Sequence, residues 1–403
     1  MKKLIAFSLC VIMLLSATSA FAATEIEFAF WMSEQQDEIF AMVEKYNQSQ
    51  DEVHVTANLI SSGYWDKMSV AIPSGEAADV FMVNALHMVD YITNGYLLDI
   101  ADLFETGAID LANYAPSTYM TSTVNGKTWG VPKDYDTIAI AYNKAVFDAA
   151  GVEYPKNGWT WDEFVETCKA IKEATGIYGV ALNGDMQSLG YLTFASGGKD
   201  FNEDGTCALN SEEVIGAYQA CADLIHVDQV APTIEELNEI DAETMFLSEM
   251  VAMVFCGSWN VNYYGSTLGD NFAIVTLPLY NGTEKNIVHS LSYVGYAQTD
   301  APEATKDFLV FLASEEAQEM TYTTVIPAFN GLADKWAARF ENLDLTGYTT
   351  SVPNGTAQPL PCAPKNSAEI YTAMCNMIAD CLMYNTVPET VAKYTDQINE
   401  LLK

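Results

Sequence analysis

Residues 125–144 read NGKTWGVPKDYDTIAIAYNK and place a polar, carboxylate-rich passage between two short apolar segments. The first segment predicts a short strand that stops at Pro132, because proline has no N–H to give to a strand ladder. The acidic passage 134–136 follows, and a second apolar strand then ends at 142–144. This order predicts a crossing segment, in which the chain leaves one domain, passes through a polar cleft and enters a second domain.

An alternation of strand and helix patterns precedes this segment. Apolar runs at 26–30, 53–59 and 79–83 predict strands, and the segments 33–46 and 64–72 between them predict helices. A β-α-β-α-β order is typical of a mostly parallel sheet with helices on both faces. A chain of 403 residues also favours two domains over one large core. We therefore predict an α/β fold with two lobes.

The second half of the chain repeats this pattern, with a predicted helix at 160–174 and predicted strands at 177–182 and 250–255. Segments 292–298 and 327–331 are candidates for two further crossings back between the lobes. We expect a signal peptide at 1–22, a first lobe at 23–133 plus 296–328, and a second lobe at 134–295 plus 329–403.

The N-terminus has the features of a signal peptide. Lys2 and Lys3 supply positive charge, residues 4–15 form a short apolar run, and the small residues around Ala22 favour cleavage there. The run is shorter than the roughly 20 residues that span a bilayer. Cys10 raises the alternative of a lipid anchor, which we favour less because the apolar run continues past it. We expect an extracytoplasmic protein, in the periplasm or at the cell surface.

The charge balance excludes several classes of partner. The chain carries 18 basic and 54 acidic residues, whereas nucleic acids and anionic membranes require a basic surface. Of its 8 cysteines, one lies in the signal peptide, and the odd number that remains prevents complete pairing within the chain. Because several fall on apolar stripes, we expect buried free thiols at Cys168, Cys207, Cys221, Cys256, Cys362, Cys375 and Cys381.

Short motifs run through most of the mature chain. They are GYWDKM at 63–68, DV at 79–80, GYLLDI at 95–100, GKTWGVP to YNK at 126–144, WTWDE at 159–163, MVAMVFCGSW at 250–259 and ATKDFLVFLASEEA at 304–317. Each motif is weak alone, but their order closely resembles that of the family 1 extracellular solute-binding proteins, the sugar-binding receptors of ABC importers. One departure is Ala78, which stands where the family usually has proline.

The resemblance implies a two-lobed periplasmic binding protein fold of type II, in which crossing strands join the lobes and the ligand lies between them. It further implies a carbohydrate ligand captured by hinge closure and a membrane permease as partner. We expect a monomer that is not an enzyme, with no catalytic residue, no cofactor and no metal.

Candidate ligand-binding residues follow from the positions of the strands, because open α/β sheets bind ligands at the carboxyl ends of their strands. Trp31, Asn84, residues 183–185 and Trp259 follow predicted strands. Aromatic rings suit the apolar face of a pyranose, and carboxylates and amides suit its hydroxyls. The resemblance also implies a cleft tryptophan at Trp259. With the crossing segments added, the predicted ligand-binding residues are Trp31, Tyr64, Asn84, Asp134, Tyr135, Asp136, Trp259, Tyr293 and Phe329.

Two alternative functions stay open at this point. A secreted glycoside hydrolase would use aromatic and acidic residues equally well, but the sequence identifies no pair of carboxylates at the required separation. A binding protein for a cationic small molecule such as a polyamine would suit the acidic composition. The segment Asp200–Gly205 resembles the start of a calcium-binding loop, but the twelfth position is Ser211 where a glutamate is required.

Overall fold

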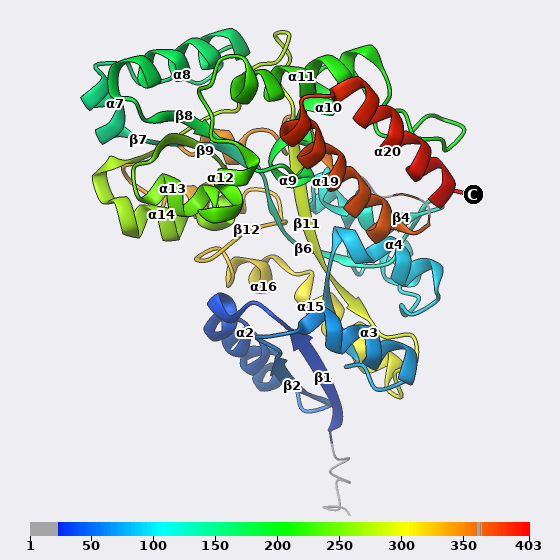
Figure 1. Cartoon of the computed structure of the whole chain (residues 1–403). Coiled ribbons are helices and arrows are strands. Elements are labelled where there is room, and N and C mark those ends of the chain that lie inside the picture. Colours follow the sequence, from blue (N-terminus) through cyan, green and yellow to red (C-terminus); the bar gives the residue numbers. More distant parts are fainter. Residues whose placement is uncertain (1–22, 361–362, 364) are drawn as a thin grey trace, which may run out of the picture.

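The computed structural model describes residues 23–360, 363 and 365–403, and it contains two main sheets with covering helices at opposite ends of the molecule (Figure 1). The predicted signal peptide at 1–22, including Cys10, and Cys362 lie outside the described residues. No described helix combines the length and the hydropathy that crossing a membrane requires.

The first sheet has seven strands, in the order β12-β6-β11-β3-β1-β2, with β13 paired to β11 beside this row. Successive residues of its strands pack on opposite faces, so that Phe28 and Met82 lie in one core and Ala29 and Phe81 lie in another. Both faces are therefore buried. The strands are β1 (Thr24–Phe30), β2 (Val53–Leu59), β3 (Val80–Asn84), β6 (Val131–Asp136), β11 (Asn286–Gly295), β12 (Ile326–Pro327) and β13 (Ala357–Pro359).

Helices from two distant parts of the sequence cover the first sheet. α3 begins after Gly63 and ends before Gly75, and both glycines adopt the left-handed conformation that favours glycine, at φ 62° and 84°. The helices are α2 (Gln36–Ser49), α3 (Tyr64–Ser74), α4 (Ala85–Thr93), α5 (Ala101–Glu105), α15 (Pro302–Leu312) and α16 (Glu315–Glu319).

The second sheet has four strands, in the order β10-β7-β9-β8. Its strands are β7 (Ile138–Asn143), β8 (Tyr178–Ala181), β9 (Val251–Gly257) and β10 (Phe272–Val275). The predicted capping box opens α8, where the side chains of Thr160 and Glu163 each bond the other's backbone N–H. The helices around this sheet are α7 (Lys144–Ala150), α8 (Trp161–Thr175), α9 (Met186–Leu189), α10 (Tyr191–Ala195), α11 (Glu212–His226), α12 (Ile234–Glu239), α13 (Ala242–Leu247), α14 (Val261–Leu268), α17 (Leu332–Ala337), α18 (Thr346–Thr349), α19 (Ser367–Tyr384) and α20 (Val387–Leu401).

Shorter elements complete the described chain. They include the hairpin of β4 (Thr123–Val124) and β5 (Lys127–Thr128), the helix α6 (Pro116–Tyr119), and the 3-10 turns η1 (Ser33–Gln35), η2 (Leu111–Asn113), η3 (Met120–Ser122), η4 (Ser258–Asn260) and η5 (Gly269–Asn271). The six described cysteines are free, and all but the half-buried Cys375 are buried.

Both sheets are mixed, which corrects the expectation of mostly parallel sheets. β1 pairs in parallel with β2 and β3, as the β-α-β alternation predicts. β11 is antiparallel to both β3 and β6, and β7 is antiparallel to β9 and β10. The antiparallel pairs involve the strands that cross between the sheets, because a crossing strand enters from the far side and need not follow the direction of its neighbours.

The predicted crossing segment joins the two sheets. β6 belongs to the first sheet, β7 belongs to the second, and Thr137 alone separates them. The strand does not stop at Pro132, however, because β6 continues through it to Asp136. The pairing of β6 with β11 shifts register at this point, and a bulge of this kind lets a strand accommodate a proline.

β11 forms a second crossing. Its residues Asn286–Val288 pair with β13, and its residues Leu291–Gly295 pair with β3 of the first sheet. Since β13 also belongs to the first sheet, the whole of β11 lies in that sheet, and the lobe boundary expected at residue 295 stays a prediction. A third crossing follows β12, which pairs with Asp134 and Tyr135 of β6.

Candidate ligand-binding site

Four aromatic side chains form one surface at the carboxyl ends of β1 and β3, which we call the aromatic shelf. Trp31 follows β1, and its ring lies 4.8 Å from that of Tyr64 and 5.0 Å from that of Trp65. Trp65 in turn stacks on His87 with 3.9 Å between centroids and 4° between planes. Of these rings, Tyr64 is buried and the others are half-buried, so the shelf presents its face through Trp31, Trp65 and His87.

Asn84 supports the shelf. Its Oδ1 accepts a hydrogen bond from the backbone N–H of His87 at 3.2 Å, which caps α4, and lies 2.7 Å from Nδ1 of the same residue. Burial lowers the pKa of His87, so the ring is neutral at neutral pH. Asn84 therefore orients His87, and its amide oxygen is already occupied in that role.

The second lobe has a hollow of about 280 Å³ at the carboxyl ends of β8 and β9, which we call the second-lobe hollow. This is the sheet edge at which open α/β sheets bind ligands. Polar and aromatic side chains dominate its lining. They include Asn183, Asp185, Gln187, Ser188, Asp241, Glu243, Trp259, Asn260 and Tyr264.

The polar groups of the second-lobe hollow are linked to one another. Asp185 caps α9 by accepting from the N–H of Ser188 at 2.7 Å, and burial raises the pKa of this carboxyl. The hydroxyl of Tyr264 donates to Oε2 of Glu243 at 3.1 Å and lies 3.3 Å from Nδ2 of Asn260. The hollow therefore offers carboxylate and amide groups that suit the hydroxyls of a sugar.

Trp259 stands at the edge of the second-lobe hollow and is 42% exposed. Its ring lies directly over Gly257, where a Cβ would be 2.3 Å from three of the ring carbons. Only glycine at 257 lets the ring lie this close, whereas the backbone there is ordinary extended chain, at φ −75° and ψ 151°, that any residue can adopt.

One strand, β11, borders both the aromatic shelf and the second-lobe hollow. Its Leu291 pairs with Asn84 behind the aromatic shelf, whereas its His289 pairs with Asp136 and contacts the ring of Trp259 at 5.4 Å. Two residues along a strand span about 7 Å, so the shelf and the hollow adjoin the same short stretch of β11. A ligand lying over this stretch would touch both lobes.

The acidic passage of the crossing segment, residues 134–136, is buried. Asp134 is fully buried in an ion pair with Lys133, whose Nζ also bonds Gln35 at 2.8 Å. Tyr135 packs in the core, and Asp136 accepts from Oγ of Ser258. Their burial has a structural cause, since β6 is paired on both sides, with β11 and with β12. They therefore expose little surface to a ligand.

Tyr293 is buried inside the first lobe. It is 1% exposed and packs edge-on against Phe28 in the core of the first lobe, with 5.7 Å between centroids. Phe329 is half-buried and lies 5.7 Å from Tyr114. Tyr64 contributes a ring edge to the shelf, while its hydroxyl donates to the carbonyl of Met82 inside the lobe.

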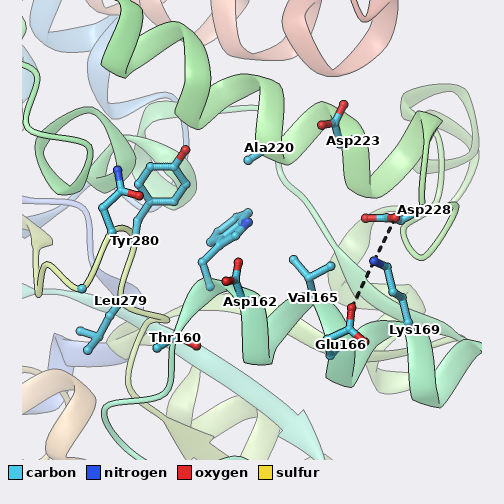
Figure 2. A pocket seen from close by; sticks show the side chains of 13 residues that line it. Thr160, Asp162, Val165, Glu166, Lys169, Ala220, Asp223, Asp228, Leu279 and Tyr280 are labelled. Carbon is cyan, nitrogen blue, oxygen red and sulfur yellow. Dashed lines mark hydrogen bonds and ion pairs between the residues drawn. The ribbon is translucent and has the colours of Figure 1, made fainter.

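A larger hollow of about 690 Å³ lies between α8 and α11 (Figure 2). Lys169 bridges its floor and bonds both Glu166 and Asp228. All of its lining residues belong to helices and loops around the second sheet, so closure of the two lobes would not enclose a ligand there.

Several residues of the site were not identified from the sequence. Glu243, Tyr264 and His87 lie on helices, and their relation to the strand ends appears only in the folded chain. His289 lies in the middle of a strand that is buried on both faces. A helix following a predicted strand is the only pattern that points toward His87, three residues after Asn84.

The chain matches the family model of the bacterial extracellular solute-binding proteins over residues 41–342, which is more than half of its length. Among curated proteins, it is 28% identical over 210 residues to an arabinooligosaccharide-binding protein of Halalkalibacterium halodurans, covering 49% of this chain and 46% of that protein. It is 26% identical over 330 residues to a lactose-binding protein of Rhizobium radiobacter, covering 77% and 75%. The match thus spans about half the length of the first relative and three quarters of the second.

Solved structures share the fold. An ABC substrate-binding protein of Listeria monocytogenes in complex with cycloalternan aligns with a TM-score of 0.80 at 21% identity, over 94% of this chain and 98% of that one. A cyclic α-maltosyl-1,6-maltose binding protein of Arthrobacter globiformis aligns with a TM-score of 0.80 at 21% identity, over 94% and 99%. These likenesses establish the two-lobed α/β architecture. Together with the family match they show that this chain belongs to the bacterial extracellular solute-binding proteins.

Proposed function

We propose that this chain is an extracytoplasmic receptor that binds a carbohydrate, of the size of a short oligosaccharide, between its two lobes. The observation that carries the proposal is the meeting of the aromatic shelf and the second-lobe hollow along β11. The aromatic shelf offers flat rings for the C–H face of a sugar, and the second-lobe hollow offers carboxylates and amides for its hydroxyls. The names of the relatives, which are oligosaccharide- and lactose-binding proteins, point the same way.

The mechanism proposed is hinge closure without a chemical step. A ligand that contacts both lobes favours the closed form by the free energy of the contacts made only there. The closed receptor then docks, as a monomer, on the membrane permease of an ABC importer. The N-terminal residues 1–22 would serve as the signal peptide that exports the chain.

The ligand-binding residues we propose are fewer than those predicted from the sequence. Trp31, Trp65 and His87 would stack on the sugar from the first lobe, with Asn84 behind them. Trp259 would stack from the second lobe. The hydroxyls would meet the carboxylates and amides of the second-lobe hollow, namely Asn183, Asp185, Gln187, Glu243 and Asn260.

A thermal-shift screen against mono- and oligosaccharides tests the proposal. A ligand present at a hundred times its dissociation constant should stabilise the folded chain by about 2.7 kcal/mol. Small-angle scattering should then show compaction with the same sugar. If only polyamines stabilise the chain, the ligand is a cationic small molecule and not a carbohydrate. If the chain releases reducing ends from an oligosaccharide, it is a hydrolase, and the receptor proposal is wrong.

A further inference from the structure

Three hydrogen bonds hold Ser258 to the crossing segment. The backbone N–H of Ser258 donates to the carbonyl of Thr137 at 3.1 Å. The N–H of Thr137 donates to Oγ of Ser258 at 3.4 Å, and the same Oγ donates to Oδ1 of Asp136 at 2.5 Å. Ser258 is buried. The residue immediately before Trp259 is therefore fixed to the two residues at which the chain passes from one sheet to the other.

His289 contacts Trp259 directly. The two rings lie 5.4 Å apart in an edge-to-face arrangement. The backbone of Gln187, in the lining of the second-lobe hollow, interacts with the ring of His289, and Nε2 of this ring has no hydrogen-bond partner among the described residues. His289 is 7% exposed and is the partner of Asp136 across the β6–β11 ladder. Both crossing strands thus reach Trp259, one through Ser258 and one through His289.

We propose that Asp136 and His289 are positioning residues that couple the orientation of Trp259 to the crossing strands, so that hinge movement and ligand stacking are linked. This inference rests on the proposed function, since the coupling matters for binding only if Trp259 contacts a ligand. Trp259 is 42% exposed, so part of its ring has no neighbour to hold it in place. Closure rotates the backbone near the crossing, and the Ser258 bonds would carry that rotation to the indole.

The ionisation of Asp136 provides a signature for the coupling. Burial raises the pKa of Asp136 to about 7, and the neighbouring Asp134 adds to the shift. The hydrogen bond from Ser258 and the charge of Lys133 act in the opposite direction, whereas Glu34 on η1 raises the pKa slightly further. Near neutral pH, the group that bonds Ser258 therefore changes its charge.

The other titratable groups around Trp259 behave differently. Burial lowers the pKa of His289 to about 4, so this ring stays neutral above pH 5. Burial raises the pKa of Tyr348, which packs near Asp136, well above its usual value. Burial also raises the pKa of Asp185 in the second-lobe hollow. An Asp136 variant is needed to separate its titration from that of Asp185.

The test follows the indole N–H resonance of Trp259 by NMR in the full chain labelled with ¹⁵N, without any sugar. Trp259→Phe assigns the resonance. We expect its position to change with pH around a midpoint near 7. Asp136→Asn should abolish that change, and Ser258→Ala should move the resonance and remove its pH response. Ser266→Ala is the control, because it removes a serine hydroxyl that donates to the carbonyl of Tyr263 within α14, at 2.9 Å, and not to Asp136. It should leave the Trp259 resonance in place.

His289 is tested by a pair of variants. His289→Ala removes the ring and should shift and broaden the Trp259 resonance, whereas His289→Phe keeps an aromatic edge and should restore it. A titration of the wild-type resonance that is flat between pH 5 and 9 would overturn the proposal, even if a variant fails to fold. An unchanged pH response in Asp136→Asn, or an unmoved resonance in His289→Ala, would overturn it as well. Because no sugar is present, a failure to bind carbohydrate would remove the proposed function and leave this result standing.

Discussion

Gly257→Ala tests whether the position of Trp259 controls ligand binding. Alanine is compatible with the backbone at this position, since φ is −75° and ψ is 151°. Its Cβ, however, would lie 2.3 Å from three ring carbons of Trp259, and no carbon pair tolerates that distance. The flexible member of the contact is the exposed indole. We therefore expect the ring to swing away while the strand stays in place.

The expected effects on stability and on affinity differ. Because Trp259 is 42% exposed, its displacement should change the free energy of unfolding by no more than about 0.5 kcal/mol, as for other surface changes. The sugar loses one aromatic platform, and an aromatic contact is worth up to about 1.5 kcal/mol beyond the area it buries. The dissociation constant should therefore rise by about tenfold, close to the effect of Trp259→Ala.

Isothermal titration with the sugar selected by the thermal-shift screen measures the affinity, and urea unfolding measures the stability. Gly216→Ala is the matched control, because a Cβ at Gly216 meets no atom within 4 Å. That change should leave affinity unaltered and stabilise α11 by up to about 1 kcal/mol. Wild-type affinity in Gly257→Ala, together with a tenfold loss in Trp259→Ala, would refute the reasoning that the ring must move.

Three further predictions concern buried groups. Lys133→Met leaves Asp134 buried without its partner and should lower the free energy of unfolding in urea by about 3–5 kcal/mol. The double variant Lys133→Met, Asp134→Leu should recover much of that stability. No recovery would contradict the interpretation that the loss comes from an unpaired buried charge. The pKa of Asp136 is higher in the folded chain than its ordinary 3.8, so the folded state holds the extra proton and stability falls as pH rises from about 4 to 7. Asp136→Asn should therefore be more stable than the wild type at pH 8 but not at pH 4, and an equal difference at both would contradict the raised pKa. Gly179→Ala places a Cβ 2.5 Å from Cα of Cys168 and should lower the free energy of unfolding by about 1–3 kcal/mol. An unchanged melting temperature would contradict this, because it would mean that α8 can move away.

The sequence could identify the strand ends but not the faces of the strands. Trp31 and Trp259 were predicted because each follows an apolar run, and both lie at the sheet edges that the structure brings together. Tyr293 is buried because β11 is buried on both faces, and no polar alternation marks which of its residues points toward the cleft.

Burial of the crossing segment was unpredictable for a related reason. A run of Asp-Tyr-Asp normally indicates exposed chain, yet Asp134 and Asp136 are buried because β11 and β12 pair with β6 from distant parts of the sequence. Local composition carries no information about that pairing. The same long-range ladder places His289 beside Trp259, so its position had no sequence signal at all.

The pairing of β3 with β11 has a consequence for the order in which the chain can fold. Val80–Asn84 can complete its ladder only with Leu291–Gly295, so the N-terminal part of the first lobe stays incomplete until most of the polypeptide has been synthesised. Contacts so distant in sequence slow folding. A truncated product ending before Asn286 would expose the free edge of β3, and unpaired edges of this kind promote aggregation.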